Sequence, residues 1–286
     1  MDISRREILK LGGGIAIGGG LSASLAAKKK VPIALQLYSL REDAKTDIVK
    51  VIAAAGKMGF EGVEFYGWGG YFGRTAKELR QLLDDNNLKS ASDHISPNML
   101  DGDKFQSTVE FHQTMGTRIL TLSSFGGSKQ AQATPQFWKD GAEKATVMAA
   151  KLKPHGMRLG FHNHPVEFTK LADGSVPWEL FFDNAGKDVL QQLDLGSVLG
   201  GGADPAVYLK RYPGRTATMH MKDHAKGKSK VLIGEGDVKW KEVVKLAESV
   251  GGIEWYIVEQ ESYPYPPLES VQRSYDNLKK ILGRKA

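Results

Sequence analysis

The chain has 286 residues, 41% of them hydrophobic, which is enough for one large domain with a well-buried core. It contains no cysteine, which excludes disulfides, thiolate metal ligands and a cysteine nucleophile. Its net charge of +6 is unevenly distributed, because the first thirty residues hold six basic and two acidic side chains. Residues 31–286 therefore carry a net charge of only +2, which gives no support to a nucleic-acid partner.

The first thirty residues have the order of an export signal. Residues 4–10, Ser-Arg-Arg-Glu-Ile-Leu-Lys, resemble the twin-arginine motif, and a glycine-rich apolar run and a small-residue cleavage site follow. The apolar run is too short and too rich in glycine for a membrane span. We expect residues 1–30 to direct the protein to the periplasm, with no stable membrane insertion after cleavage. The alternative is a disordered basic N-terminus with an accidental Arg-Arg pair.

Strand and helix patterns alternate from residue 31 onward. Ile33, Leu35 and Leu37 recur with the period of a strand, and Thr75 with Glu78 fits a capping box at a helix start. In the first half we expect strands at 31–40, 62–67, 89–94 and 118–125. Helices are expected between them at 47–58, 75–86, 103–115 and 134–155.

The second half continues this alternation. Strands are expected at 158–164, 189–196, 216–223 and 254–262, and helices at 178–184, 205–211, 238–250 and 267–282. Strands that alternate with helices indicate a parallel sheet, and eight units favour closure into a single (β/α)8 TIM barrel over an open sheet. Since no linker interrupts this part, residues 31–286 are expected to form one catalytic domain.

Four polar side chains follow successive predicted strands, at the end of the barrel where such enzymes keep their chemistry. They are Glu167, Asp194, His220 and Glu259. Three carboxylates at close range need a positive partner, and with one imidazole they form an oxygen-rich ligand set. The set predicts one divalent metal, Mn²⁺, Mg²⁺ or Co²⁺, with Zn²⁺ also compatible. Singly, each residue could instead cap a strand end or pair with Lys or Arg.

Five motifs in chain order resemble the xylose-isomerase-like TIM barrel family of sugar phosphate isomerases and epimerases. They are His162-Asn163-His164 with Glu167-Phe168, Leu193-Asp194-Leu195-Gly196, His220-Met221-Lys222-Asp223, Gly234-Glu235-Gly236-Asp237 before Trp240, and Val258-Glu259-Gln260-Glu261. The arrangement is closest to the inosose-dehydratase-like branch and to exported relatives that act on 3-keto sugars. The resemblance implies that Glu167 and Glu259 bind the metal and also serve as the acid/base pair.

Other residues near the predicted mouth are candidates for contacts with a sugar. The metal would stabilise an enediolate, while Lys222 could polarise the carbonyl. The substrate-binding candidates are His94, His162, His164, Glu64 and Trp68, with Tyr38 and Tyr66 as further surfaces for a sugar ring. Glu64 could instead pair with Arg41 or Lys57, and Trp68 could anchor a loop. We expect His112 on a helix surface.

These observations predict an exported, divalent-metal-dependent isomerase or epimerase that acts on a free ketose or keto sugar. If a hydroxyl is expelled, the same site is a dehydratase or β-elimination lyase acting on inososes or 3-keto-glycosides. Less favoured are an endonuclease IV-like phosphodiesterase, which needs more histidines than the seven present, and a sugar-binding protein without catalysis. The expected partner is a small sugar and not nucleic acid; a homo-oligomer is left open.

Overall fold

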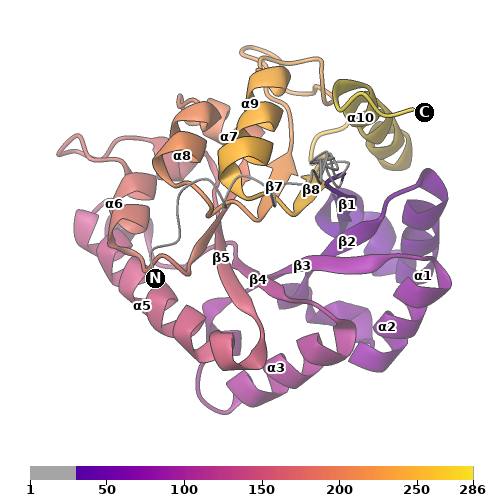
Figure 1. Cartoon of the computed structure of the whole chain (residues 1–286), viewed down its shortest axis with the longest axis horizontal. Coiled ribbons are helices and arrows are strands. Elements are labelled where there is room, and N and C mark those ends of the chain that lie inside the picture. Colours follow the sequence, from indigo (N-terminus) through magenta and orange to yellow (C-terminus); the bar gives the residue numbers. More distant parts are fainter. Residues whose placement is uncertain (1–29, 286) are drawn as a thin grey trace, which may run out of the picture. The chain divides into compact units, whose positions relative to one another are not determined.

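The computed structural model describes residues 30–285, apart from the side chain of Trp68. Within these residues eight parallel strands pair in chain order and close into a barrel (Figure 1). Their bounds are β1 Ile33–Gln36, β2 Gly62–Tyr66, β3 Lys89–Ile95, β4 Ile119–Leu122, β5 Arg158–His162, β6 Leu190–Asp194, β7 Thr218–Met221 and β8 Trp255–Val258. The predicted (β/α)8 TIM barrel is confirmed.

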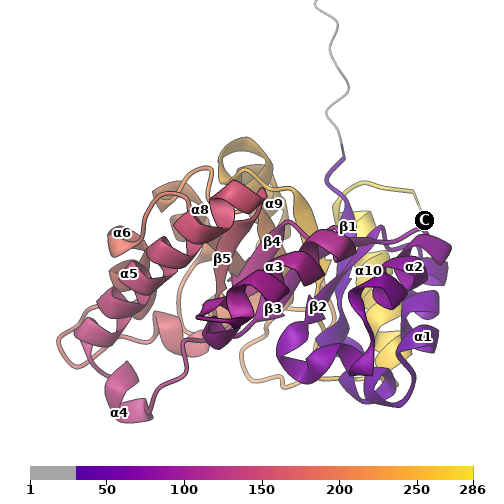
Figure 2. The ribbon, with the colours of Figure 1, turned by 90° about the horizontal axis from the view of Figure 1, so that it is seen from below.

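Helices surround the strands in Figure 1, and α4, which follows β4, lies beyond the carboxyl ends of the strands in Figure 2. Their bounds are α1 Arg41–Met58, α2 Ala76–Asp85, α3 Lys104–Met115, α4 Lys129–Gln132, α5 Pro135–Leu152, α6 Pro177–Asn184, α7 Leu195–Gly200, α8 Pro205–Arg211, α9 Trp240–Leu246 and α10 Pro267–Ile281. The predicted capping box is present at α2, where the side chains of Thr75 and Glu78 each accept the other's backbone N–H. Apolar side chains buried between helices and strands form the core.

All strands except β3 are shorter than predicted at their carboxyl ends. Residues predicted to continue β1 form a 3-10 helix, Leu37–Leu40, and Pro165–Phe168 forms another shortly after β5. Beyond β6 the chain turns at once into α7, because the side chain of Asp194 caps that helix by accepting the N–H of Ser197 at 2.7 Å. The residues at the barrel mouth therefore belong to turns and helix starts.

Alternate strand positions build layers inside the barrel. Small and apolar residues, including Ala34, Ala91 and Ile257, form one buried layer. The next inward positions are polar and are joined to one another across the barrel by hydrogen bonds: Gln36, Glu64, Ser92, Gln192 and Thr218. Two residues further along β3, β5, β6 and β7, the chain places His94, His162, Asp194 and His220, so a polar layer lies directly beneath the mouth.

His112 corrects the prediction of a helix-surface residue, because its side chain is fully buried. Its Nε2 lies 2.9 Å from Oδ2 of Asp93, which also accepts the hydroxyl of Tyr71 at 2.8 Å. The other carboxylate oxygen of Asp93 accepts the N–H of Gly67. This network fastens the loop Gly67–Gly73 to α3.

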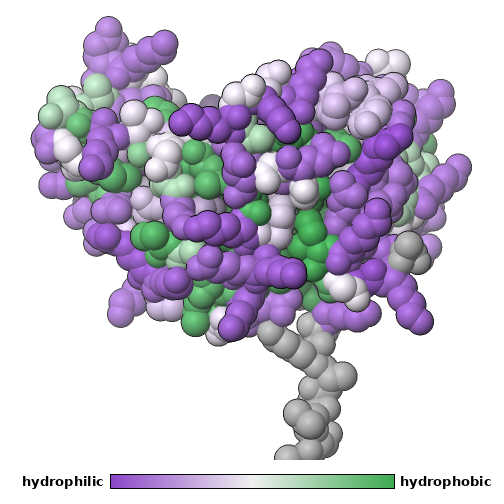
Figure 3. Space-filling model, turned by 90° about the horizontal axis from the view of Figure 1, so that it is seen from above, coloured by the Kyte–Doolittle hydropathy of each residue, from purple (hydrophilic) through white to green (hydrophobic). Residues whose placement is uncertain are grey.

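Apolar side chains are scattered over the surface. On the face in Figure 3 hydrophilic residues predominate and the apolar ones form separate small groups. The large apolar residues that are exposed in the described chain are Val49, Val147, Val166, Val207, Val250, Tyr265 and Leu268. Among residues 30–285, no helix has the length and apolar character needed to cross a membrane.

Candidate metal centre

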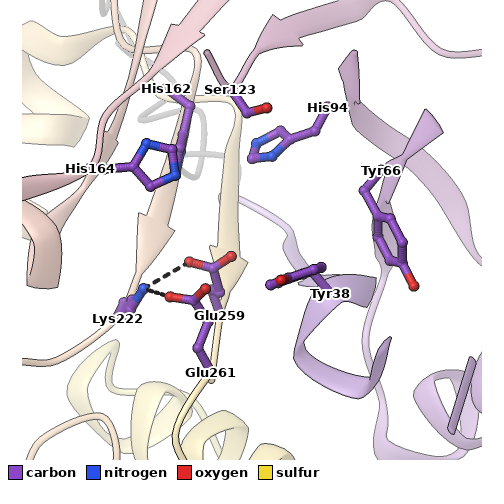
Figure 4. Close-up of a pocket in the computed structure, with 9 residues that line it drawn as sticks. All are labelled: Tyr38, Tyr66, His94, Ser123, His162, His164, Lys222, Glu259 and Glu261. Atoms are coloured by element: carbon purple, nitrogen blue, oxygen red, sulfur yellow. Dashed lines mark hydrogen bonds and ion pairs between the residues drawn. The ribbon is translucent and has the colours of Figure 1, made fainter. Parts of the chain in front are cut away.

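A cavity of about 160 Å³ opens at the carboxyl ends of the strands (Figure 4). Its lining residues are Tyr38, Tyr66, His94, Ser123, His162, His164, Lys222, Glu259 and Glu261. They lie at or shortly after the carboxyl ends of every strand except β6, as expected for a mouth built from successive strand ends. The cavity has room for a small ligand.

Four side chains at this mouth offer ligand atoms that all lie within 4.8 Å of one another. They are His162 at the end of β5, Asp194 at the end of β6, His220 in β7 and Glu259 directly after β8. All four are buried. Two imidazoles and two carboxylates make a donor set for a divalent cation such as Mn²⁺, Co²⁺ or Zn²⁺.

Two of these ligand atoms are buried without a hydrogen bond. They are Oδ2 of Asp194 and Nδ1 of His220. Oδ2 of Asp194 lies 3.4 Å from Nζ of Lys222, and Nδ1 of His220 lies 3.3 Å from Oε2 of Glu259. Both contacts are within ion-pair distance but lack the geometry of a hydrogen bond. Because buried polar atoms are rarely left without a partner, these two atoms fit a cation between them. The residues present therefore suit a divalent metal.

The backbone around Asp194 is held by the residue between the two histidines of the His162-Asn163-His164 motif. The side-chain oxygen of Asn163 accepts the N–H of Asp194 at 2.9 Å, and its amide nitrogen donates to the carbonyl of Asp194 at 3.2 Å. These two hydrogen bonds join the ends of β5 and β6. They hold His162 and Asp194 next to one another.

Lys222 supplies positive charge to the acidic side of the cavity. Its ammonium lies 3.2 Å from Oε2 of Glu259 and also contacts Glu261 (Figure 4). Burial disfavours the charged ammonium, but Asp194, Glu259 and Glu261 raise the pKa of Lys222 well above its usual value. Lys222 thus remains charged and offsets part of the repulsion between the carboxylates.

The site residues have shifted proton affinities. Burial raises the pKa of Asp194 to about 6, although Lys222 opposes the shift. For Glu259, burial is outweighed by Lys222 and His220, so its pKa lies well below the usual value and the group is ionised. Burial also favours the neutral ring of His220, but Glu64 and Glu259 raise its pKa to about 10. A cation bound here would displace a proton from His220, since metal ligands bind deprotonated.

The structure does not place Glu167 with the other predicted ligands. Its carboxylate accepts the backbone N–H of His164 at 2.7 Å, as part of the cap of the 3-10 helix Pro165–Phe168. Among the described residues a second group, His94, His162 and His220, could also hold an ion, and Glu167 belongs to neither group. Pro165 turns the chain into this helix and directs the carboxylate to the backbone. Its position in the ligand group is taken by His162.

The predicted substrate-binding residues fall into three cases. His94, His162 and His164 line the cavity together with Lys222. Glu64 is fully buried in the polar layer below and is not among the lining residues. The side chain of Trp68 lies outside the described part of the chain.

Two further residues, Ser123 and Glu261, line the cavity without a role predicted from the sequence. Ser123 follows β4 directly, so it occupies the same kind of strand-end position as Asp194 and Glu259. Glu261 lies two residues after Glu259 and contacts the ammonium of Lys222. The sequence signal that could have identified both residues is their position shortly after a predicted strand.

Residues 52–281 match the family model described as Xylose isomerase-like TIM barrel. Among characterised proteins, the chain is 26% identical over 245 residues to an inosose dehydratase of Clostridium perfringens, which covers 72% of this chain and 80% of that protein. An inosose dehydratase of Clostridium tetani is 23% identical over 264 residues, covering 77% and 84% of the two chains.

Two solved structures show the same fold. A sugar phosphate isomerase/epimerase from Parabacteroides distasonis superposes with a TM-score of 0.75 at 24% identity, covering 90% of this chain and 97% of that chain. The IOLI protein with a bound zinc atom superposes with a TM-score of 0.66 at 14% identity, covering 88% and 98%.

Proposed function

Because this chain belongs to the xylose isomerase-like TIM barrel family, we propose that it is a divalent-metal-dependent dehydratase of a small, unphosphorylated keto sugar or keto-polyol. The observation that carries the proposal is the buried group of His162, Asp194, His220 and Glu259 at the edge of the mouth cavity. These residues would hold the metal, which would supply Lewis-acid polarisation of the substrate carbonyl. The similarity to inosose dehydratases supports a keto-polyol as the substrate.

Glu259 is the group best suited to remove a proton from carbon. It lines the cavity and is held ionised by Lys222 and His220. In the proposed reaction Glu259 takes the proton from the carbon next to the carbonyl. The electron pair of that C–H bond forms a carbon–carbon double bond as the C–O bond of the next carbon breaks.

The leaving oxygen must gain a proton to depart as water. His94 and His164 line the same cavity, and imidazole is the side chain most often used for such transfers. Glu167 is not among the residues that line the cavity, so the predicted acid/base pair of Glu167 and Glu259 is not present there. The imidazoles therefore favour dehydration over the isomerase prediction.

Isomerisation or epimerisation is the second candidate. It is favoured by the presence of Glu259 and two further imidazoles around a single cavity, because the removed proton could be returned to carbon instead of oxygen. The two reactions share their first step and differ in the fate of the neighbouring hydroxyl.

A neutral substrate suits the charges at the mouth. Lys222 is the only Lys or Arg among the described residues that line the cavity, and it is surrounded by Asp194, Glu259 and Glu261. A phosphate group would meet these carboxylates without a free Lys or Arg side chain among the described lining residues to bind it. We expect unphosphorylated keto sugars to bind and their phosphorylated forms to bind much more weakly.

Incubation of the metal-loaded protein in D₂O with ketoses, inososes and 3-keto-glucosides tests these assignments. We expect deuterium to enter substrate or product at the carbon beside the carbonyl, and water to be lost from a keto-polyol. Deuterium uptake with no loss of water would move the assignment to an isomerase. Binding of these sugars with neither exchange nor turnover would favour a sugar-binding protein and would contradict catalysis.

We propose export from the twin-arginine resemblance alone, since residues 1–29 lie outside the described residues. In fractionated cells the shortened chain is expected in the periplasm, and replacement of both Arg5 and Arg6 by Lys is expected to retain the full-length chain in the cytoplasm. Recovery of only the uncut, cytoplasmic protein from unmodified cells would contradict export.

A further inference from the structure

The carboxylate of Glu64 lies fully buried beneath the mouth and collects hydrogen bonds from several strands. Its Oε1 accepts from Gln36 Nε2 at 2.6 Å and lies 2.5 Å from Nε2 of His220. Its Oε2 accepts from Gln192 Nε2 at 2.7 Å and from the hydroxyl of Ser92. An ionised carboxylate can only accept hydrogen bonds, so every one of these neighbours must be a donor.

This requirement fixes the arrangement of His220. Its Nε2 must carry the hydrogen that points to Glu64. In the neutral ring the lone pair is then on Nδ1, the atom that is buried without a hydrogen bond and belongs to the group of possible metal ligands. Glu64 thus orients His220 so that the correct nitrogen faces the proposed metal.

The same carboxylate acts on His162 through Gln192. Because Nε2 of Gln192 donates to Glu64 and, at 2.9 Å, to Thr218, the amide oxygen must point the other way. That oxygen lies 3.0 Å from Nδ1 of His162, which must therefore carry a hydrogen. In the neutral ring of His162, Nε2 then holds the lone pair.

We propose that Glu64 is a positioning residue that sets the tautomers of both histidine ligands, His220 directly and His162 through Gln192. This inference rests on the proposed metal site and adds a role that differs from the predicted substrate contact. Carboxylates that hold a ligating histidine through its second nitrogen commonly contribute a factor of 10 to 100 in metal affinity.

Two variants distinguish the direct contact of Glu64 with His220 from its indirect effect on His162 through Gln192. Glu64→Gln introduces an amide that both donates and accepts, so neither His220 nor Gln192 keeps a required orientation. Gln192→Met removes the acceptor for His162 without a change of charge and leaves the contact between Glu64 and His220. Asp93→Asn is the matched control, because Asp93 is also a buried carboxylate with a histidine partner, His112, but it touches no proposed ligand.

Two readouts are compared in each variant: Mn²⁺ affinity from EPR titration, and the positions of the imidazole hydrogens in metal-free, ¹⁵N-histidine-labelled protein. In the unmodified protein we expect the single hydrogen of the neutral His162 ring on Nδ1. The charged, metal-free ring of His220 should carry a hydrogen on Nε2 that is bonded to Glu64, beside a second one on Nδ1. Glu64→Gln should disturb the hydrogens of both rings and weaken Mn²⁺ binding about 10- to 100-fold. Gln192→Met should disturb His162 and also His94, whose Nε2 lies 2.6 Å from the same amide oxygen, but not His220, and it should weaken binding less. Asp93→Asn should change neither the Mn²⁺ affinity nor the hydrogens of His162 and His220, although those of its own partner His112 will respond.

Unchanged imidazole hydrogens and unchanged affinity in Glu64→Gln would overturn the positioning role, as would an equal effect of Asp93→Asn. If Glu64→Gln does not fold, Gln192→Met carries the test, and wild-type spectra and affinity in that variant would overturn the link to His162. If the unmodified protein binds no Mn²⁺, the proposed metal site fails, whereas the imidazole hydrogens still decide the role of Glu64.

Discussion

Replacement of Glu259 by Gln is expected to lower kcat/KM by about 10³-fold or more, with a loss of metal affinity. The amide keeps the shape of the side chain but removes the charge that stabilises Lys222 and the cation, and it cannot accept a proton from carbon. The carboxylate is buried at the cavity, 3.2 Å from the ammonium of Lys222. Steady-state kinetics at saturating metal separates the loss of catalysis from the loss of binding.

Glu167→Gln is the matched control for this experiment. Glu167 is buried to a similar degree, but its carboxylate accepts a backbone N–H, which the amide oxygen of Gln can also accept. We expect kcat/KM and metal affinity to stay within a few-fold of the unmodified protein. If Glu167→Gln abolished activity and Glu259→Gln did not, the resemblance-based role of Glu167 would be restored and the present site would be wrong.

Removal of divalent metal by chelation is expected to abolish turnover, and one equivalent of Mn²⁺ or Co²⁺ per chain should restore it. One carboxylate oxygen of Asp194 and one of Glu259 lie within 4.8 Å of each other, so a single ion could contact both. Oδ2 of Asp194 has no hydrogen bond that would compete with this contact. Without a metal, carbonyl polarisation would depend on Lys222 alone, whose charge is already shared by three carboxylates.

Circular dichroism of the chelated protein provides the control for this removal, because loss of activity through unfolding would be visible as loss of helix signal. We expect the spectrum to be retained, since the barrel core does not depend on the ligand group. Full turnover after exhaustive chelation would contradict a metal-dependent reaction.

The alternation of strand and helix patterns was sufficient to predict the barrel. It also placed Asp194, His220 and Glu259 at strand ends, and the structure brings these three together. Closure of a barrel makes successive strand ends neighbours, so chain order alone predicts proximity. The boundaries were less predictable, since side-chain caps such as that of Asp194 end strands earlier than hydrophobic patterns indicate.

The fourth member of the candidate ligand group could be found only by a count of strand positions. His162 is two residues beyond Gly160 in β5, as Asp194 is two residues beyond Gln192 in β6, so both share the inward-facing parity. Glu167 had the chemically expected side chain, but Pro165 begins a 3-10 helix before it. Parity within the strand therefore indicates which side chain lies with Asp194, His220 and Glu259, and residue type alone does not.

Depth within the barrel was not predictable from the sequence. Glu64 lies at register with Gln36 and Ser92, one layer below His94, and register between strands cannot be read from a single strand pattern. His112 was likewise misplaced, because its burial depends on Asp93, whose side chain meets it from another element. Polar residues can be buried wherever a partner is present, and the partner is set by tertiary structure.

The position of the metal is the claim on which the other proposals depend. An anomalous difference map of crystals grown with Mn²⁺ tests it most directly. We expect one peak per chain, in contact with Nδ1 of His220, Nε2 of His162 and the carboxylates of Asp194 and Glu259. A map without a peak at these four side chains, or with the ion at Glu167 instead, would contradict it.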